Sequence, residues 1–126
     1  MEKIGSALQD WKLHEGEYRL MEVIWENEPV NSTALAGLCQ AQLGWKKSTT
    51  YTVLRKLGQR GLLKNESATV ISLVKKSQVQ RYESHRVVEH SFGGSLPAFL
   101  NAFLSEKKLS REEAEELKGM IEEASK

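Results

Sequence analysis

The sequence predicts a mainly helical protein with one small β-hairpin, and three observations support this fold class. Most of the chain repeats its apolar side chains at the period of an amphipathic helix. One short stretch, residues 62–74, is instead rich in β-favouring residues on either side of a polar turn. The length of 126 residues, with 40% hydrophobic and 28% charged side chains, suits one or two small folded domains and disfavours a large multilayer enzyme.

The first helix is predicted to begin at Glu15, after a loose arm formed by residues 1–13. Pro29 ends this helix, because a proline pushes the preceding residue out of the α region. The apolar side chains on one side of the helix are Tyr18, Met21, Ile24 and Trp25.

A second helix follows Asn31 or Ser32, either of which can cap its first turn. Gly44 can supply the left-handed residue that ends it. Its apolar face contains Leu35, Leu38, Cys39 and Leu43.

A third helix can be capped by Ser48 or Thr49 and is expected to end near Gly61. Two β-leaning runs then flank a polar turn at residues 65–68. Three short helices followed by a hairpin is the order of elements in a winged helix-turn-helix domain. We therefore place such a domain at residues 1–75. The third helix is predicted to turn Thr50, Val53, Leu54 and Leu57 inward.

The remaining residues, 76–126, are predicted to form a helical dimerisation region. Helices are expected over Ser77–Phe92 and Leu96–Leu104, separated by two glycines, and the S-x-x-E pattern at Ser110 opens a last helix. About 50 residues are too few for an independent core, and an exposed apolar helix face marks an interface. The alternative is that these helices fold back onto the first domain. The side chains expected at the dimer interface are Phe92, Leu96, Phe99, Leu100, Phe103, Leu104, Leu117 and Ile121.

The net charge of +1 conceals an uneven distribution along the chain. Residues 1–30 carry a net charge of −4, residues 31–90 a net charge of +7, and residues 91–126 a net charge of −2. Six basic residues and no acid lie between Lys46 and Lys64. Such a block is either a solvated surface or a binding site for a polyanion, and the release of counterions from phosphates favours the second reading.

The sequence contains no recognisable catalytic constellation. It lacks a nucleotide-binding glycine motif, H-E-x-x-H and G-x-S-x-G. Cys39 is the lone cysteine and lies on an apolar helix face, which excludes an internal disulfide. His85 and His90 would point about 140° apart on a helix. We predict a protein without catalytic activity, cofactor or metal. With no secretion signal and no apolar run long enough to span a bilayer, it is expected to be cytoplasmic.

The outer face of the third helix carries the residue types that DNA recognition requires. Tyr51, Thr52 and Arg55, with Ser48 beside them, would lie nearest the bases in the major groove. Lys64 could add a phosphate contact from the hairpin. The residues expected nearer the DNA backbone are Lys46, Lys47, Thr49, Lys56 and Arg60.

Two other functions compete with DNA binding alone as interpretations of this sequence. A winged-helix module that binds only protein would use the same helix face without a dependence on salt, and the acid-free cationic block argues against it. A DNA-binding protein controlled by a small ligand remains open, although no polar pocket residues can be named for it.

With these residues in view, the chain resembles the penicillinase-repressor (BlaI/MecI-like) family of bacterial transcription regulators. The matching stretches are Glu17–Trp25; Trp45–Leu57, which is similar to W-x-x-x-T-x-x-T-x-L-x-R-L; Arg60–Leu63; Phe92–Leu96; and Leu109–Leu117. Together they cover roughly residues 13–123 in the expected order.

The resemblance implies a homodimer of winged-helix domains that represses a promoter by binding an inverted repeat in double-stranded DNA. It also implies release through a membrane-bound zinc peptidase, followed by cleavage in the dimerisation helix. The scissile Asn-Phe bond of the family aligns with Ala102-Phe103, and the asparagine stands one residue earlier, at Asn101. The chain also has Lys46-Lys47-Ser48 where Ser-Pro-Lys is common, and Ala68-Thr69 in the wing in place of Gly-Arg.

Overall fold

The computed structural model describes residues 10–126 of the chain. The chain divides into two compact units, Met1–Ser84 and His85–Lys126. The first unit therefore extends past residue 75, where the sequence placed the end of the winged-helix domain. The reason is that the next helix begins within this unit, where its residue Val79 is fully buried.

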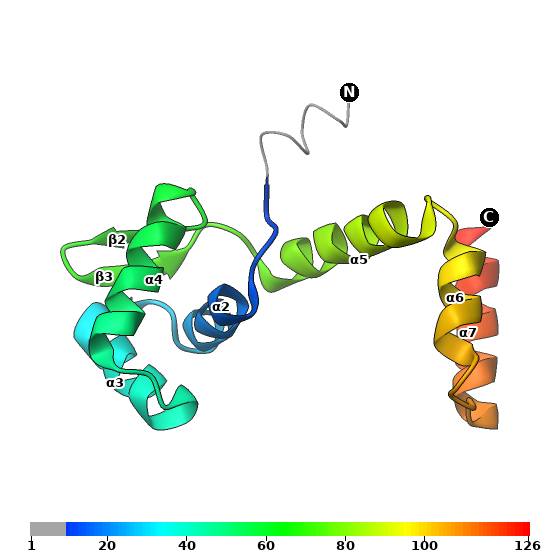
Figure 1. The fold of residues 1–126 in the computed structure, drawn as a ribbon, viewed down its shortest axis with the longest axis horizontal. Coiled ribbons are helices and arrows are strands. Elements are labelled where there is room, and N and C mark those ends of the chain that lie inside the picture. The colour runs from blue at the N-terminus through cyan, green and yellow to red at the C-terminus, as the bar shows by residue number, and fades with distance from the viewer. Residues whose placement is uncertain (1–9) are drawn as a thin grey trace. The chain divides into compact units, whose positions relative to one another are not determined.

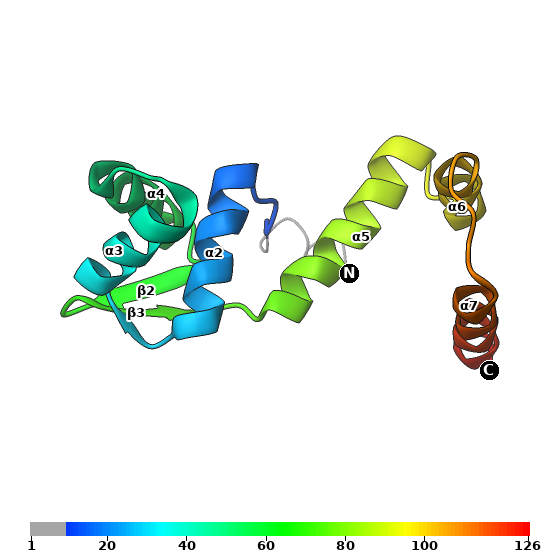
Figure 2. The ribbon, with the colours of Figure 1, turned by 90° about the horizontal axis from the view of Figure 1, so that it is seen from below.

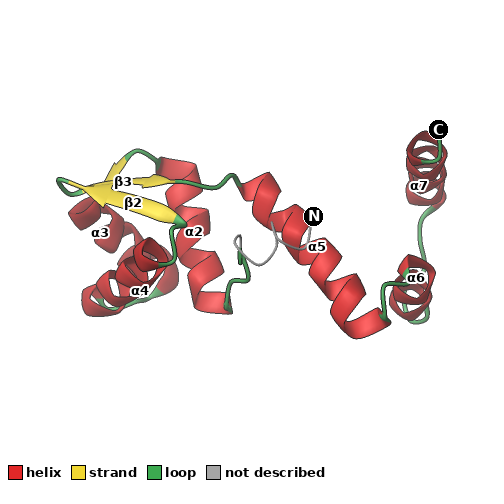
Figure 3. Ribbon diagram, turned by 90° about the horizontal axis from the view of Figure 1, so that it is seen from above, coloured by secondary structure: helices red, strands yellow, loops and turns green. Residues whose placement is uncertain are grey.

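The first unit has the element order of a winged helix and includes one strand, β1, that the sequence did not predict. The three helices α2, α3 and α4 lie on one side of a small sheet (Figures 2 and 3). The elements are α2 (Glu15–Asn27), β1 (Val30–Asn31), α3 (Ser32–Leu43), α4 (Lys47–Gln59), β2 (Leu63–Glu66) and β3 (Thr69–Ser72) (Figure 1).

The sheet is antiparallel and has the strand order β1-β3-β2. Val70 lies opposite Val30 on one side and opposite Asn65 on the other. The hairpin turn consists of only Ser67 and Ala68, which both have positive φ angles of 53° and 64°. This conformation matches the right-handed twist of the strands it joins. The expected turn over residues 65–68 was therefore too long, since Asn65 and Glu66 belong to β2.

The core of the first unit joins the inner faces of the helices to the sheet. Asn31 caps α3 by accepting hydrogen bonds from the backbone N–H groups of Thr33 (2.8 Å) and Ala34 (3.2 Å), which confirms one of the two predicted caps. Gly44 ends α3 with a φ of 70°, also as predicted. The fully buried large side chains of the core are Leu20, Met21, Ile24, Leu35, Cys39, Thr50, Leu57, Leu62, Val70 and Val79.

The predicted caps of α4 were wrong. The helix starts at Lys47, with Lys46 at the N-cap position and no side chain bonded to the first turn. Ser48 and Thr49 therefore lie inside the helix, where their side chains are exposed.

Residues 10–13, the described part of the expected loose arm, are held against the first unit. Leu13 is buried in the core, and the Trp11 ring packs against it. Trp11 also meets the Tyr82 ring edge-on, with 6.2 Å between ring centroids. We call these four residues the strap. The part of the arm before Asp10 lies outside the described residues.

The second unit contains the end of α5 (Lys76–Phe92) together with α6 (Leu96–Leu104) and α7 (Arg111–Ala124). Gly93 and Gly94 end α5 with φ angles of 57° and 84°, which glycine adopts without a steric cost. The Ser110 hydroxyl caps α7 by accepting a hydrogen bond from the Glu113 N–H at 3.0 Å. No residue of α6 or α7 is buried.

No helix among residues 10–126 combines the length and apolar character needed to cross a membrane. These residues also contain no group of three or more side chains placed to hold a metal ion.

Candidate nucleic-acid interface

Helix α4 presents a cationic face that its own amphipathic pattern turns outward. Thr50, Leu54 and Leu57 are buried beneath the helix, and Val53 is half-buried beside them. The opposite face has no acidic residue. Its exposed side chains are Lys46, Lys47, Ser48, Thr49, Tyr51, Thr52, Arg55 and Lys56.

The N-terminal end of α4 adds a second source of positive potential. The Lys46 side chain does not cap this end, and the Thr49 and Thr50 N–H groups bond to the Lys46 carbonyl at 3.0 and 3.2 Å. The N–H groups left for an anion at this end are therefore those of Lys47 and Ser48. Lys46 and Lys47 lie at the same end. The helix dipole, the open N–H groups and the two ammonium groups all favour an anion such as a phosphate there.

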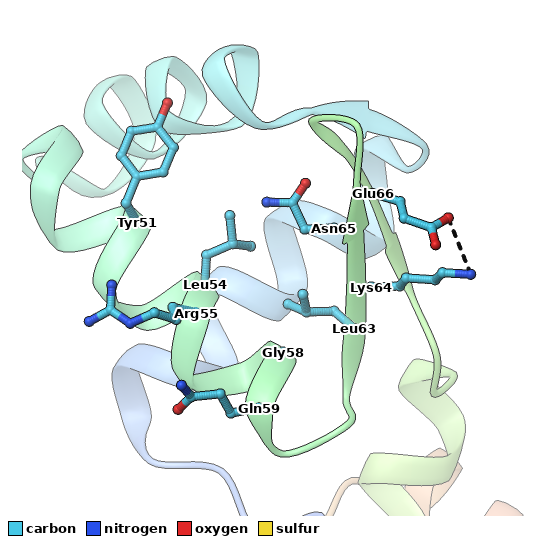
Figure 4. Close-up of a pocket in the computed structure, with 9 residues that line it drawn as sticks. All are labelled: Tyr51, Leu54, Arg55, Gly58, Gln59, Leu63, Lys64, Asn65 and Glu66. Atoms are coloured by element: carbon cyan, nitrogen blue, oxygen red, sulfur yellow. Dashed lines mark ion pairs between the residues drawn. The ribbon is translucent and has the colours of Figure 1, made fainter.

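The hairpin of β2 and β3, residues 63–72, is the wing of the winged helix. A groove of about 670 Å³ separates α4 from β2. Its floor is apolar, because Leu54 of α4 and Leu63 of β2 point toward each other (Figure 4). Tyr51 and Arg55 line it from the helix, and Asn65 lines it from the strand. Such a groove can accept a strand of nucleic acid, with apolar contacts at its floor and hydrogen bonds along its edges.

Gln59 and Asn65 line this groove but were missing from the predicted DNA-binding residues. Asn65 was missed because it was assigned to the turn. Its place in β2, two residues after the buried Leu63, puts it on the groove side of the strand.

Lys64 and Glu66 also line the groove, and in Figure 4 the Lys64 side chain extends from β2 to the side away from α4. Its ammonium group is 3.3 Å from the Glu66 carboxylate, and both side chains are well exposed. Glu66 is the only acidic residue in the sequence between Glu28 and Glu83, and its charge opposes that of Lys64.

Unlike the other cations of α4, whose side chains face solvent, Arg60 forms hydrogen bonds within the protein. Its guanidinium donates hydrogen bonds to the Glu17 carboxylate at 3.1 Å and to the backbone carbonyl groups of Asp10 and Lys12 at 3.0 and 2.6 Å. All three acceptors belong to the protein itself. We therefore leave Arg60 out of the candidate DNA-contacting residues.

Cys39 lies between α3 and α4 and is fully buried. Burial raises the pKa of its thiol, and an interaction with the Thr50 side chain offsets part of that rise. A buried thiol with a raised pKa is a poor nucleophile, so this cysteine is a packing residue behind α4.

The apolar side chains expected at the dimer interface lie in the second unit, and several are largely exposed. Leu96 is 55% exposed, Phe103 51% and Ile121 58%. Leu104 is also exposed, whereas Phe92, Phe99, Leu100 and Leu117 are partly covered. Met120, at 59% exposed, was missing from the predicted interface, although it follows Leu117 by three residues and therefore neighbours it on the surface of α7. The residues Ala102 and Phe103 lie inside α6.

A winged helix whose third helix presents an acid-free cationic face to solvent is the architecture of a DNA-binding transcription regulator. Comparison with known proteins is consistent with this class. The profile of the penicillinase repressor family matches residues 13–123, and the chain belongs to that family.

Its relatives include two proteins named for regulation. The methicillin resistance regulatory protein MecI of Staphylococcus aureus is 22% identical over 115 residues, which cover 88% of this chain and 94% of the relative. The penicillinase repressor of Bacillus licheniformis is 24% identical over 116 residues, covering 89% and 91%. The protein is thus a DNA-binding transcriptional repressor and not an enzyme, as the residue pattern predicted.

Proposed function

We propose that the protein represses transcription as a homodimer that binds an inverted-repeat operator, with one α4 helix in the major groove of each half-site. The observation that carries this proposal is the exposed, acid-free cationic face of α4 beside the groove that it forms with β2. Two such helices spaced by about one turn of DNA, ~34 Å, would read a dyad.

Two kinds of contact are assigned within this surface. Tyr51, Thr52 and Arg55, with Ser48 nearby, would face base edges from the exposed side of α4. The lysines at the open end of α4 would bind phosphates, because a point charge beside free N–H groups holds a phosphate regardless of the base. The full set of phosphate-contacting residues is Lys46, Lys47, Thr49, Lys56 and, from the wing, Lys64.

The proposed dimer follows from the exposed apolar surface of the second unit. Helices α6 and α7 bury no residue in the single chain and make few contacts with each other. A contiguous apolar surface of this kind is removed from water when a second copy covers it. Cleavage between Ala102 and Phe103 would cut through α6, so a membrane sensor metallopeptidase that triggered it would act by separating the protomers.

The test of DNA binding is a mobility-shift titration at low salt, using a duplex from the upstream region of the protein's own gene and a mixed-sequence duplex. We expect a retarded complex with both and tighter binding to the first. The affinity should fall steeply as the salt concentration rises. An unshifted duplex at low salt contradicts the proposal and favours a protein-binding module.

Substitutions on α4 separate the two kinds of contact. Lys47→Gln should weaken binding to all duplexes alike and flatten the salt dependence by about one unit of slope. Arg55→Gln should cost about 1–3 kcal/mol of binding free energy and change the preferred sequence. Equal losses on specific and mixed-sequence DNA for both variants would reject the assignment of Arg55 as a base-reading residue.

A further inference from the structure

Arg60 stands at the junction of three segments that are distant in the sequence. It is the C-cap residue of α4, and its guanidinium reaches Glu17 on α2 as well as the backbone of the strap. The Glu17 carboxylate also accepts a hydrogen bond from the backbone N–H of His14 at 2.9 Å. The cluster therefore ties the end of the helix that faces DNA to α2 and to residues 10–14.

The geometry of this cluster is that of an internal structural pair and not of a cation waiting for a ligand. The Glu17 side chain is 11% exposed and the Arg60 side chain 29%. The planar guanidinium distributes its hydrogen bonds over one carboxylate and two carbonyl groups, an arrangement that a lysine ammonium cannot reproduce as well. Removing either charged partner leaves the other poorly solvated and unpaired.

The strap is in turn fixed on its other side. The Tyr82 hydroxyl lies 3.3 Å from the Asp10 carboxylate, and the Tyr82 ring meets Trp11. Leu13 is buried in the core. The strap is thus a fixed support against which the Arg60 guanidinium can hold the end of α4.

The two ends of α4 are held differently. The N-terminal end has no side-chain cap and carries the residues that face DNA. At the C-terminal end, the Arg60 N–H bonds to the Lys56 carbonyl at 3.1 Å and the Leu62 N–H bonds to the Leu57 carbonyl at 3.0 Å, in addition to the bonds of the guanidinium.

The C-terminal end of α4 therefore contributes to the direction of the helix, together with the packing of the buried side chains Thr50, Leu54 and Leu57. A helix of 13 residues is about 20 Å long, so a tilt of about 5° at one end moves the other end by roughly 2 Å. Such a displacement is larger than a hydrogen bond to a base edge tolerates.

We propose that Arg60, together with Glu17 and the strap, is a positioning residue for DNA recognition: it fixes the direction of α4 from within the protein and does not contact a phosphate. This inference rests on the proposed DNA-binding function. It makes Arg60 unlike Lys47 and Lys56, although all three are cations of the same helix segment.

The test compares Arg60→Gln and Glu17→Gln in the full-length protein with Lys47→Gln. Each variant is titrated at several salt concentrations with two probes: a duplex that the wild-type protein selects from a randomised pool, and a mixed-sequence duplex. Arg19→Gln is the matched control, since Arg19 is an exposed arginine of the same unit whose one ion pair within residues 10–126 is with Glu15, at 3.0 Å on its own helix. Melting curves establish that each variant is fully folded at the temperature of the titration.

We expect Arg60→Gln and Glu17→Gln each to weaken binding of the selected duplex about 5- to 10-fold, with a smaller loss on the mixed-sequence duplex and an unchanged salt slope. The double variant should lose no more than the larger single loss, because both changes break one cluster. Lys47→Gln should flatten the slope, and Arg19→Gln should leave both quantities at wild-type values. A role confined to stability would lower the melting temperature and leave the affinity of the folded protein unchanged.

Three outcomes overturn the inference. They are a salt slope flattened by about one unit in Arg60→Gln, unchanged DNA affinity in Glu17→Gln, and full wild-type affinity in Arg60→Lys, which keeps the charge but not the planar fork. If Arg60→Gln does not fold, Arg60→Lys and Glu17→Gln still decide the question. A wild-type protein that shifts neither duplex would instead overturn the proposed function itself.

Discussion

The two units of this protein bury their apolar side chains to very different extents. The first unit encloses a continuous core, in which Leu20, Leu35 and Leu57 are fully inaccessible to solvent. In the second unit α6 and α7 contain no buried residue, although α6 is the most apolar of the described helices. The comparison teaches that the surface proposed to bind DNA lies on a unit that encloses its own core, whereas α6 and α7 leave apolar side chains in solvent that the proposed dimer would cover.

The largest effect should come from removing α6 and α7, the helices of the proposed dimer interface. A chain truncated after Phe92 is expected to fold but to remain monomeric, because the core of the first unit is kept and the apolar faces are lost. Its affinity for an inverted repeat should fall by about 10²- to 10⁴-fold, since the two half-sites are no longer bound by one linked molecule. Sedimentation and a DNA titration measure the two consequences. A truncated chain that still sediments as a dimer would contradict the comparison.

Single leucines in the two units should destabilise the protein in different ways. Leu57→Ala creates a cavity in a packed core and should cost about 2–5 kcal/mol of unfolding free energy at any protein concentration. Leu104→Ala removes an exposed side chain of α6, so its effect should appear as weaker self-association. Denaturation at several protein concentrations distinguishes them. If dilution enlarges the effect of Leu57→Ala as much as that of Leu104→Ala, the two units do not differ as described.

The helix caps offer a smaller and closely matched comparison. Asn31→Ala removes the acceptor for two N–H groups at the start of α3 and should lower the free energy of unfolding of the first unit by about 1 kcal/mol. Ser110→Ala removes the corresponding cap of α7. We expect it to weaken self-association and leave the melting of the first unit unchanged. Thermal melts and sedimentation of both variants provide the measurement, and a dimer weakened only by Asn31→Ala would refute this assignment.

The smallest expected effect concerns a buried polar group in the core of the first unit. Among the described residues the Thr50 hydroxyl oxygen is buried without a hydrogen-bond partner of normal geometry. Thr50→Val keeps the shape of the side chain and removes the polar atom, so it should leave stability unchanged or raise it by up to about 1 kcal/mol. Thr49→Val, at an exposed neighbouring position, is the control and should change stability by less than about 0.5 kcal/mol. A clear loss of stability in Thr50→Val would indicate that the hydroxyl bonds to Cys39 more strongly than its geometry suggests.

Much of the fold could be predicted from residues close together in the chain. The cap at Asn31, the left-handed Gly44 and the bounds of α6 are local features that depend on a few neighbouring residues. The outward direction of the cations on α4 also followed from the spacing of Thr50, Leu54 and Leu57, because a helix that buries one face must expose the other. Met120 was missing from the predicted interface residues, because only Leu117 and Ile121 were selected on α7.

Other features depend on partners that are distant in the sequence. The two-residue strand β1 has no pattern of its own and exists because it pairs with β3 some 40 residues later. The strap was predicted to be loose because nothing in residues 10–13 reveals that Arg60 and Tyr82 hold it. Sequence alone determined which helices form and which surface of α4 is cationic, since periodicity and charge are properties of the chain itself. Only the tertiary structure decided that Arg60 bonds inward, because the direction of a long, flexible side chain is set by the acceptors that folding places within its reach.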